Sequence, residues 1–212
     1  TLERIGALCH KHHVLVLSDE IHCDITAPGK DYIPFASVSK INQEISMTCI
    51  APTKAFNIAG LQTSCIVVPN AVLRHKVNRG INTDEVAEAN SFAISASIAA
   101  FQKGREWLME LRTYIEHNKQ KAVAYINEHI PELYVVPSKA TYLLWVDCSK
   151  VCSDSIMLVD YIRKETGLYV SDGAEYGENG KQFIRINVAC PYQRMMDGLE
   201  RLNEGIKSFQ RK

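Results

Sequence analysis

The sequence lacks three features that would each indicate a class of protein: a Cys-x-x-Cys pair, an excess of one charge, and an apolar run long enough to cross a membrane. Its seven cysteines are scattered and odd in number, which is typical of reduced thiols in an intracellular protein. Lysine plus arginine and aspartate plus glutamate number 24 each, so the charge does not favour a nucleic acid or an anionic membrane as a partner. The first residues do not have the layout of a signal peptide. We therefore expect a cytoplasmic protein that acts on a small molecule.

Histidines and one cysteine gather in the first part of the chain. Their spacing matches no zinc pattern, so we expect no metal site. The residues concerned are His10, His12, His13, His22 and Cys23.

Three short apolar runs predict strands of a parallel α/β sheet, at residues 14–19, 45–50 and 64–69. An apolar stripe over residues 2–9 predicts a helix before the first strand. A run rich in alanine predicts a buried helix over residues 84–101. Three strands make a thin sheet. We therefore expect that an N-terminal part of the sheet is not included in this sequence.

A long amphipathic helix is predicted over residues 105–130, and Pro131 ends it. The remaining pattern is α+β, with strands near 133–137, 141–148, 168–171 and 183–189, a helix near 154–165 and a last helix from Pro191. The predicted organisation is therefore part of an α/β large domain (1–105), a connecting helix (106–130) and a small α+β C-terminal domain (131–212).

The stretch "IAPTKAFNIAG" places Lys54 just after the predicted strand at 45–50. Most lysines are solvated, and an isolated lysine on a loop needs no further explanation. Open α/β sheets, however, bind ligands at the carboxyl ends of their strands. A lysine that is desolvated in such a place is a candidate imine-forming nucleophile, because burial favours its neutral amine.

Two further positions could work with Lys54. Asp19 ends the predicted strand at 14–19, where it is either a turn cap or a fixed negative charge beside Lys54. Arg185 lies in a predicted strand and is either a surface residue or a planar grip for a carboxylate. Tyr142 is a candidate substrate contact, although it and Trp145 have the character of core residues.

Five blocks, "SDEIH", "APTKAFNIAGLQ", "REWLMELRTYIEHN", "TYLLWVDCS" and "FIRINVACP", occur in this order. Together they resemble the C-terminal part of fold-type I pyridoxal-phosphate enzymes, and most closely the MalY/PatB-type β-lyases classed with the class I/II aminotransferases. The resemblance implies pyridoxal 5'-phosphate as the cofactor, bound covalently by Lys54, which also moves the substrate α-proton. It implies that Asp19 pairs with the pyridine nitrogen and that Arg185 holds the substrate α-carboxylate. It also implies a homodimer.

The sequence departs from the common pattern of that family at three positions. His22 stands where aminotransferases have a tyrosine that donates to the ring oxygen, and histidine there resembles the lyase branch. Ala51 replaces a phosphate-binding serine, so Thr53 is the candidate hydroxyl. Gln62 replaces an arginine or lysine. Phosphate binding is therefore expected to depend more on family residues that would lie N-terminal to this sequence.

The resemblance predicts α,β-elimination of cystathionine or an S-substituted cysteine to a thiol, pyruvate and ammonia. Transamination of amino acids is the first alternative, since it shares every step through the carbanion. A non-catalytic regulator that kept the fold is the second. The joint presence of Asp19, Lys54 and Arg185 favours an enzyme.

Overall fold

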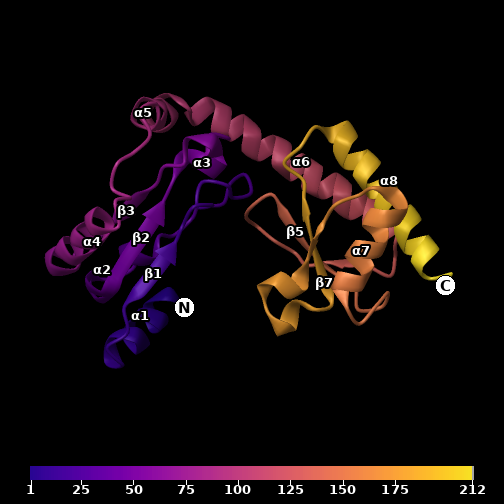
Figure 1. The fold of residues 1–212 in the computed structure, drawn as a ribbon, viewed down its shortest axis with the longest axis horizontal. Coiled ribbons are helices and arrows are strands. Elements are labelled where there is room, and N and C mark those ends of the chain that lie inside the picture. Colours follow the sequence, from indigo (N-terminus) through magenta and orange to yellow (C-terminus); the bar gives the residue numbers. More distant parts are fainter. Residues whose placement is uncertain (212) are drawn as a thin grey trace. The chain divides into compact units, whose positions relative to one another are not determined.

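The computed structural model describes residues 1–211 and divides into two compact units, Thr1–Glu110 and a second that begins at Leu111 (Figure 1). Within the described residues, no helix is both long and apolar enough to span a bilayer.

The first unit is a three-stranded sheet with short helices. The strands are β1 (Val16–Asp19), β2 (Ser46–Ile50) and β3 (Cys65–Val67), in the order β1-β2-β3. The parallel pairing expected of all three strands holds for β1 and β2, but β3 runs antiparallel to β2. The helices are α1 (Leu2–Lys11), α2 (Lys40–Ile45), α3 (Pro52–Ala55), α4 (Ala71–Thr83) and α5 (Ala93–Lys103).

The helix predicted over residues 84–101 is wrong in its first half and in its burial. Helix α5 begins only at Ala93, because Glu85 takes a left-handed conformation (φ 56°) and the Asn90 side chain accepts a hydrogen bond from Phe92 N. Its large apolar side chains are exposed within this chain, with Ile94 at 63% and Phe101 at 49%.

Helix α4 was not predicted, although its start is well defined. Asn70 caps it, since its Oδ1 accepts hydrogen bonds from Val72 N at 2.9 Å and Leu73 N at 3.1 Å. No residue of α4 is buried, although Leu73, Val77 and Ile81 recur at a spacing of four residues that indicates a helix.

The second unit is a four-stranded antiparallel sheet with helices against one face. Its strands are β4 (Tyr134–Val135), β5 (Leu143–Asp147), β6 (Ser171–Asp172) and β7 (Phe183–Asn187), in the order β4-β5-β7-β6. The strand predicted at 168–171 is displaced, because β6 begins only at Ser171. The helices are α6 (Arg105–His129), which begins in the first unit, α7 (Ser155–Thr166) and α8 (Tyr192–Phe209), close to the predicted ranges.

Alternation along β5 and β7 decides which side chains face the core. Leu144 and Ile184 are almost fully buried in a cluster with residues of α6, α7 and α8. Arg185 and Trp145, which are cross-strand neighbours, therefore lie on the opposite face of the sheet.

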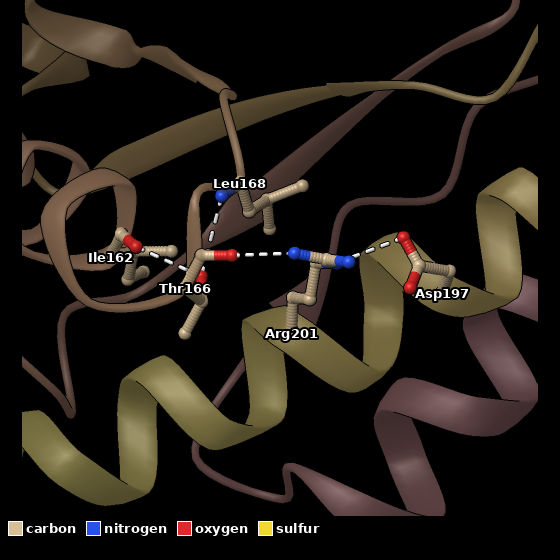
Figure 2. Close-up of polar contacts among 5 residues, drawn as sticks. All are labelled: Ile162, Thr166, Leu168, Asp197 and Arg201. Atoms are coloured by element: carbon tan, nitrogen blue, oxygen red, sulfur yellow. Dashed lines mark hydrogen bonds and ion pairs between the residues drawn. The ribbon is translucent and has the colours of Figure 1, made fainter.

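Helices α7 and α8 pack side by side (Figure 1), and a hydrogen bond connects them where α7 ends. Arg201 of α8 donates from Nη1 to the Thr166 carbonyl at 2.7 Å and pairs with Asp197 at 2.9 Å, as Figure 2 shows. Gly167 follows Thr166 in the left-handed conformation (φ 74°), which glycine adopts without steric cost.

Candidate active site

The candidate site of the first unit lies where β1 and β2 end. The two strands are parallel and in register, with Asp19 opposite Cys49. The Asp19 charge raises the pKa of the Cys49 thiol in addition to the larger effect of burial. Helix α3 starts two residues after β2, so Asp19 and the residues of α3 share the carboxyl edge of this sheet, where α/β proteins bind ligands.

Lys54 is the exposed side chain of an otherwise buried turn. Ala51, Pro52, Thr53 and Ala55 are all buried, whereas Lys54 is exposed. The expected desolvation of Lys54 is therefore not provided by the turn that carries it, because the residue is exposed there. The turn presents the lysine at the sheet edge without enclosing it.

Aromatic side chains pack against the residue that follows this turn. Phe56, the residue after α3, stacks on Trp107 with ring centres 5.8 Å apart and meets the edge of Phe101 at 6.0 Å. Gly104 makes room for it, because a Cβ at that position would lie 2.5 Å from the Phe56 ring. The backbone that carries Lys54 is therefore fixed, although its side chain is exposed.

Both interpretations of Asp19 are compatible with its environment. Its Oδ1 accepts a hydrogen bond from Ile21 N at 3.2 Å, which is a local turn cap. The carboxylate is nevertheless exposed, so it remains accessible to a ligand at the sheet edge.

The next residue, Glu20, was not singled out from the sequence and has a structural role. It is buried, and its Oε1 accepts hydrogen bonds from Ser18 Oγ at 2.9 Å and Phe35 N at 3.0 Å. Alternation along the strand could have indicated that one acid of this adjacent pair faces inward.

His22 and Thr53 are the remaining polar residues predicted for this edge, and Thr53 is buried. His22 is half-buried in the turn that follows Asp19, and its carbonyl accepts a hydrogen bond from Ile25 N at 3.0 Å. Burial raises the pKa of the Cys23 thiol in this turn to about 11, and the charges of Asp24 and Glu20 contribute in the same direction.

Arg185 belongs to the second unit and is described there alone. Its Nη2 donates to Ser171 Oγ at 3.3 Å, and its guanidinium carbon lies 4.7 Å from the centre of the Tyr176 ring. Within residues 1–211, no carboxylate lies at ion-pair distance from Arg185. A partly buried guanidinium without a protein carboxylate can receive the carboxylate of a ligand.

The loop before β7 places Tyr176 beside Arg185, which the sequence did not reveal. Tyr176 meets Trp145 edge to face, and Trp145 stacks on Phe183. Gly173 and Gly180 allow the loop to close on itself, since a Cβ on either would collide with the backbone of the other.

Tyr142 has more the character of a core residue than of a contact. It is half-buried and packs against the core cluster of the second unit. Burial raises its pKa, and the positive charge of Arg185 acts in the opposite direction. The described residues contain no cluster of three side chains suited to bind a metal ion.

Comparison with known proteins adds the family to this geometry. A family model described as "Aminotransferase class I and II" matches residues 1–202. The chain belongs to this family. The predicted fold class, part of a pyridoxal-phosphate transferase α/β domain followed by a small α+β domain, is confirmed by the family match and by the similarity to solved structures.

Curated relatives of this family member include two bacterial proteins. The cystathionine beta-lyase PatB of Bacillus subtilis is 38% identical over 205 residues, which cover 97% of this chain and 53% of PatB. The protein MalY of Escherichia coli is 29% identical over 208 residues, which cover 98% of this chain and 53% of MalY. The chain thus spans about half the length of the curated relatives it matches.

Solved structures of the family have the same fold. A PLP-bound putative aminotransferase from Clostridium difficile matches with a TM-score of 0.93 and 36% identity over 97% of this chain and 53% of its own. Cystalysin from Treponema denticola, whose structure contains pyridoxal 5'-phosphate, matches with a TM-score of 0.93 and 26% identity over 98% of this chain and 52% of its own.

Proposed function

We propose that this chain acts in a pyridoxal-phosphate-dependent carbon–sulfur lyase. The substrate is cystathionine or another S-substituted cysteine, and the products are a thiol, pyruvate and ammonia. The observation that carries the proposal is the placement of Asp19 and the Lys54 turn at the ends of two adjacent parallel strands. The similarity to the cystathionine beta-lyase PatB supports the lyase chemistry.

The side chains at this edge carry the chemical groups that pyridoxal phosphate needs. Lys54 offers the amine that pyridoxal enzymes need, Asp19 an exposed carboxylate for the pyridine nitrogen, and His22 a ring N–H for the ring oxygen. For the phosphate the fit is weaker, because Ala51 carries no hydroxyl and Thr53 is buried. The proposal therefore assigns the covalent bond to Lys54 and the ring contacts to Asp19 and His22. Only the Thr53 hydroxyl is assigned to the phosphate.

When bound, the cofactor supplies an electron sink for the carbanion that forms at the substrate α-carbon. Lys54 Nζ removes the α-proton, for which an exposed side chain on a fixed turn has the necessary freedom. Asp19 holds a proton on the ring nitrogen by its negative charge. Arg185 binds the α-carboxylate with two parallel N–H donors, and Tyr142 is a candidate second contact to the substrate.

The proposal includes an organisation and a setting. We assign residues 1–105 to the cofactor-binding domain, 106–130 to a connecting helix and 131–212 to a small C-terminal domain. We also propose a homodimer, which is supported by apolar side chains exposed on the strands, namely Leu17 at 66%, Val67 at 46% and Ile66 at 41%. Seven free cysteines support a reducing cytoplasm as the compartment.

Transamination is the second candidate, and a specific observation favours it. The solved structure of a putative aminotransferase is 36% identical to this chain, close to the identity with PatB. Both reactions use the same amine, carboxylate and guanidinium, so these residues support either outcome.

The first experiment tests the cofactor site. The chain is mixed with pyridoxal phosphate, reduced with borohydride, digested and mapped by mass spectrometry. We expect a pyridoxyl group on Lys54 and its loss in Lys54→Arg. Equal labelling of Lys54 and of Lys40, an exposed lysine of the same unit, would contradict the proposal.

The second experiment separates the two reactions in the enzyme that contains this chain. Pyruvate and a free thiol formed from cystathionine support the lyase. Transfer of the amino group to an added keto acid, without pyruvate or thiol, would replace the lyase by a transaminase.

A further inference from the structure

Cys148 and Cys152 stand at the two ends of one turn that follows β5. Cys152 N donates to the Cys148 carbonyl at 3.0 Å, and Val151 N donates to the same oxygen at 2.9 Å. A turn of this helical type separates its end Cα atoms by about 6 Å. Disulfides form between Cα atoms about 4.4 to 6.8 Å apart, so the backbone already has the spacing of a disulfide.

The two thiols differ in access and in reactivity. Cys148 is fully buried, whereas Cys152 is half-buried. The interaction with the Cys148 side chain lowers the pKa of Cys152 to about 7, and the Asp154 backbone contributes in the same direction, while burial acts against both. The same interaction, together with burial, raises the pKa of Cys148. Cys152 is therefore the nucleophile, and Cys148 is the protected thiol beside it.

Oxidation of the pair removes both thiol protons, but each carbonyl that accepted a hydrogen bond from a thiol keeps a backbone N–H donor. Cys148 Sγ donates to the Gln182 carbonyl at 3.1 Å, but Cys148 N donates to the same oxygen at 2.8 Å. Cys152 Sγ donates to the Asp154 carbonyl at 3.2 Å, which also accepts from Leu158 N at 3.4 Å. Oxidation of the pair thus creates no unsatisfied buried acceptor.

We propose that Cys152 and Cys148 form a peroxide-reactive dithiol in which Cys152 reacts with the peroxide first and Cys148 resolves it to a disulfide. The Cys152 sulfur attacks one peroxide oxygen, the O–O bond breaks, and water leaves with a sulfenic acid on Cys152. The Cys148 sulfur then displaces that hydroxyl, the S–S bond forms, and a second water leaves with the Cys148 proton. Two thiols are oxidised and one hydrogen peroxide is reduced to two waters.

Three other half-buried thiols are poorer targets. Burial raises the pKa of Cys23, Cys49 and Cys190, and it is the largest cause in each case. Cys65 is exposed and has no cysteine opposite it in β2, since it pairs with Ile50. It therefore serves as the internal reference for nonspecific oxidation.

The test uses the wild-type chain and one equivalent of hydrogen peroxide, followed by alkylation of free thiols and trypsin digestion. Lys150 lies between the two cysteines. Cleavage there gives two peptides, one with Cys148 and one with Cys152, which only the disulfide holds together. We expect this linked pair, two hydrogens lighter than its separate peptides, to form before Cys65 is oxidised and to disappear on reduction. Oxidation of Cys65 with Cys148 and Cys152 still alkylated would overturn the proposal.

Two variants of Cys148 separate its roles. Cys148→Ser keeps a hydrogen-bond donor but removes the resolving sulfur, so Cys152 should remain a sulfenic acid that dimedone traps. Cys148→Ala also removes the donor, so the pH midpoint for alkylation of Cys152 should rise from near 7 toward the ordinary value of about 8.5. An unchanged midpoint in Cys148→Ala, or a linked pair in Cys148→Ser, would contradict the assigned roles.

Discussion

The guanidinium carbon of Arg185 lies 4.7 Å from the centre of the Tyr176 ring. This contact joins β7 to the loop before it and leaves the N–H groups of the arginine without a carboxylate among residues 1–211. The ring thus orients a cation without neutralising it, as a site for a carboxylate ligand requires.

Replacement of Tyr176 by leucine is expected to lower the free energy of unfolding by about 1 to 2 kcal/mol, because the cation–π and edge-to-face contacts contribute about 0.5 to 1.5 kcal/mol each. Tyr176→Phe keeps the ring and should leave stability nearly unchanged. Urea denaturation measures both. Equal losses in the two variants would show that the hydroxyl, rather than the ring, is important.

In the proposed enzyme, Arg185→Lys is expected to lower kcat/KM for amino acid substrates by about 10- to 100-fold. A lysine cannot make the two parallel hydrogen bonds, which are charge-assisted and contribute about 1.5 to 3 kcal/mol. Steady-state kinetics check this, with Arg194→Lys, at an exposed arginine of α8, as the control. A loss of the same size in both variants would contradict the role of Arg185.

The elements that the sequence predicted well are those with a regular apolar pattern. Helices α6 and α8 carry buried residues at three-to-four spacing, such as Ile115, Ala122 and Ile126 in α6, and prolines mark where α6 ends and α8 begins. Helix α4 buries nothing, but its Asn70 cap and the spacing of Leu73, Val77 and Ile81 could have indicated it. An alanine-rich run at 84–101 concealed the point at which α5 begins.

For the candidate site, sequence position predicted which strand ends carry Asp19 and Lys54, because residues after a strand lie at its carboxyl edge. Exposure of Lys54 and burial of Glu20 depend on which tertiary neighbours are present. Contact between Arg185 and Tyr176 depends on how the glycine loop folds back, which no periodicity encodes.

Gly167 offers a test of backbone conformation where α7 ends. Gly167→Ala is expected to destabilise the chain by about 1 kcal/mol, since φ is 74° there. Gly198→Ala, in the middle of α8, should instead stabilise it by up to about 1 kcal/mol, because the added Cβ meets Leu168 at an ordinary 3.6 Å. Thermal or urea denaturation compares the two, and a shift of the same sign in both would contradict this account.

Asn118 connects α6 to the segment after β7. It is fully buried, and its Nδ2 donates to the carbonyls of Val188 at 2.9 Å and Cys190 at 3.0 Å. Asn118→Leu is expected to cost about 2 to 4 kcal/mol of stability, because two carbonyls lose a donor at about 1 to 3 kcal/mol each. Gln120→Leu, at an exposed position of the same helix, should change stability by less than about 0.5 kcal/mol. Similar losses in both variants would show that the introduced leucine, not the loss of the buried amide, is responsible.

Lys119 should make stability depend on pH. Burial lowers its pKa, against the opposing charge of Glu116, while Nζ donates to the carbonyl of Ser138 at 3.0 Å and that of Ala140 at 3.4 Å. The folded chain therefore releases this proton at a lower pH than the unfolded chain, whose lysine has a pKa of about 10.4. Between those two values the unfolded state binds more protons, so stability rises with pH through that window.

Lys119→Met removes this proton and with it the rise. The free energy of unfolding of the wild type, minus that of Lys119→Met, is expected to increase from pH 7 to above about 10.4, in urea titrations at successive pH values. Lys121→Met, at an exposed lysine of the same helix, controls for the loss of one positive charge. A difference that stays constant or falls across the window would mean that the folded chain keeps the Lys119 proton as firmly as the unfolded chain does. In that case the two carbonyl contacts, rather than burial, would dominate the energetics of this lysine.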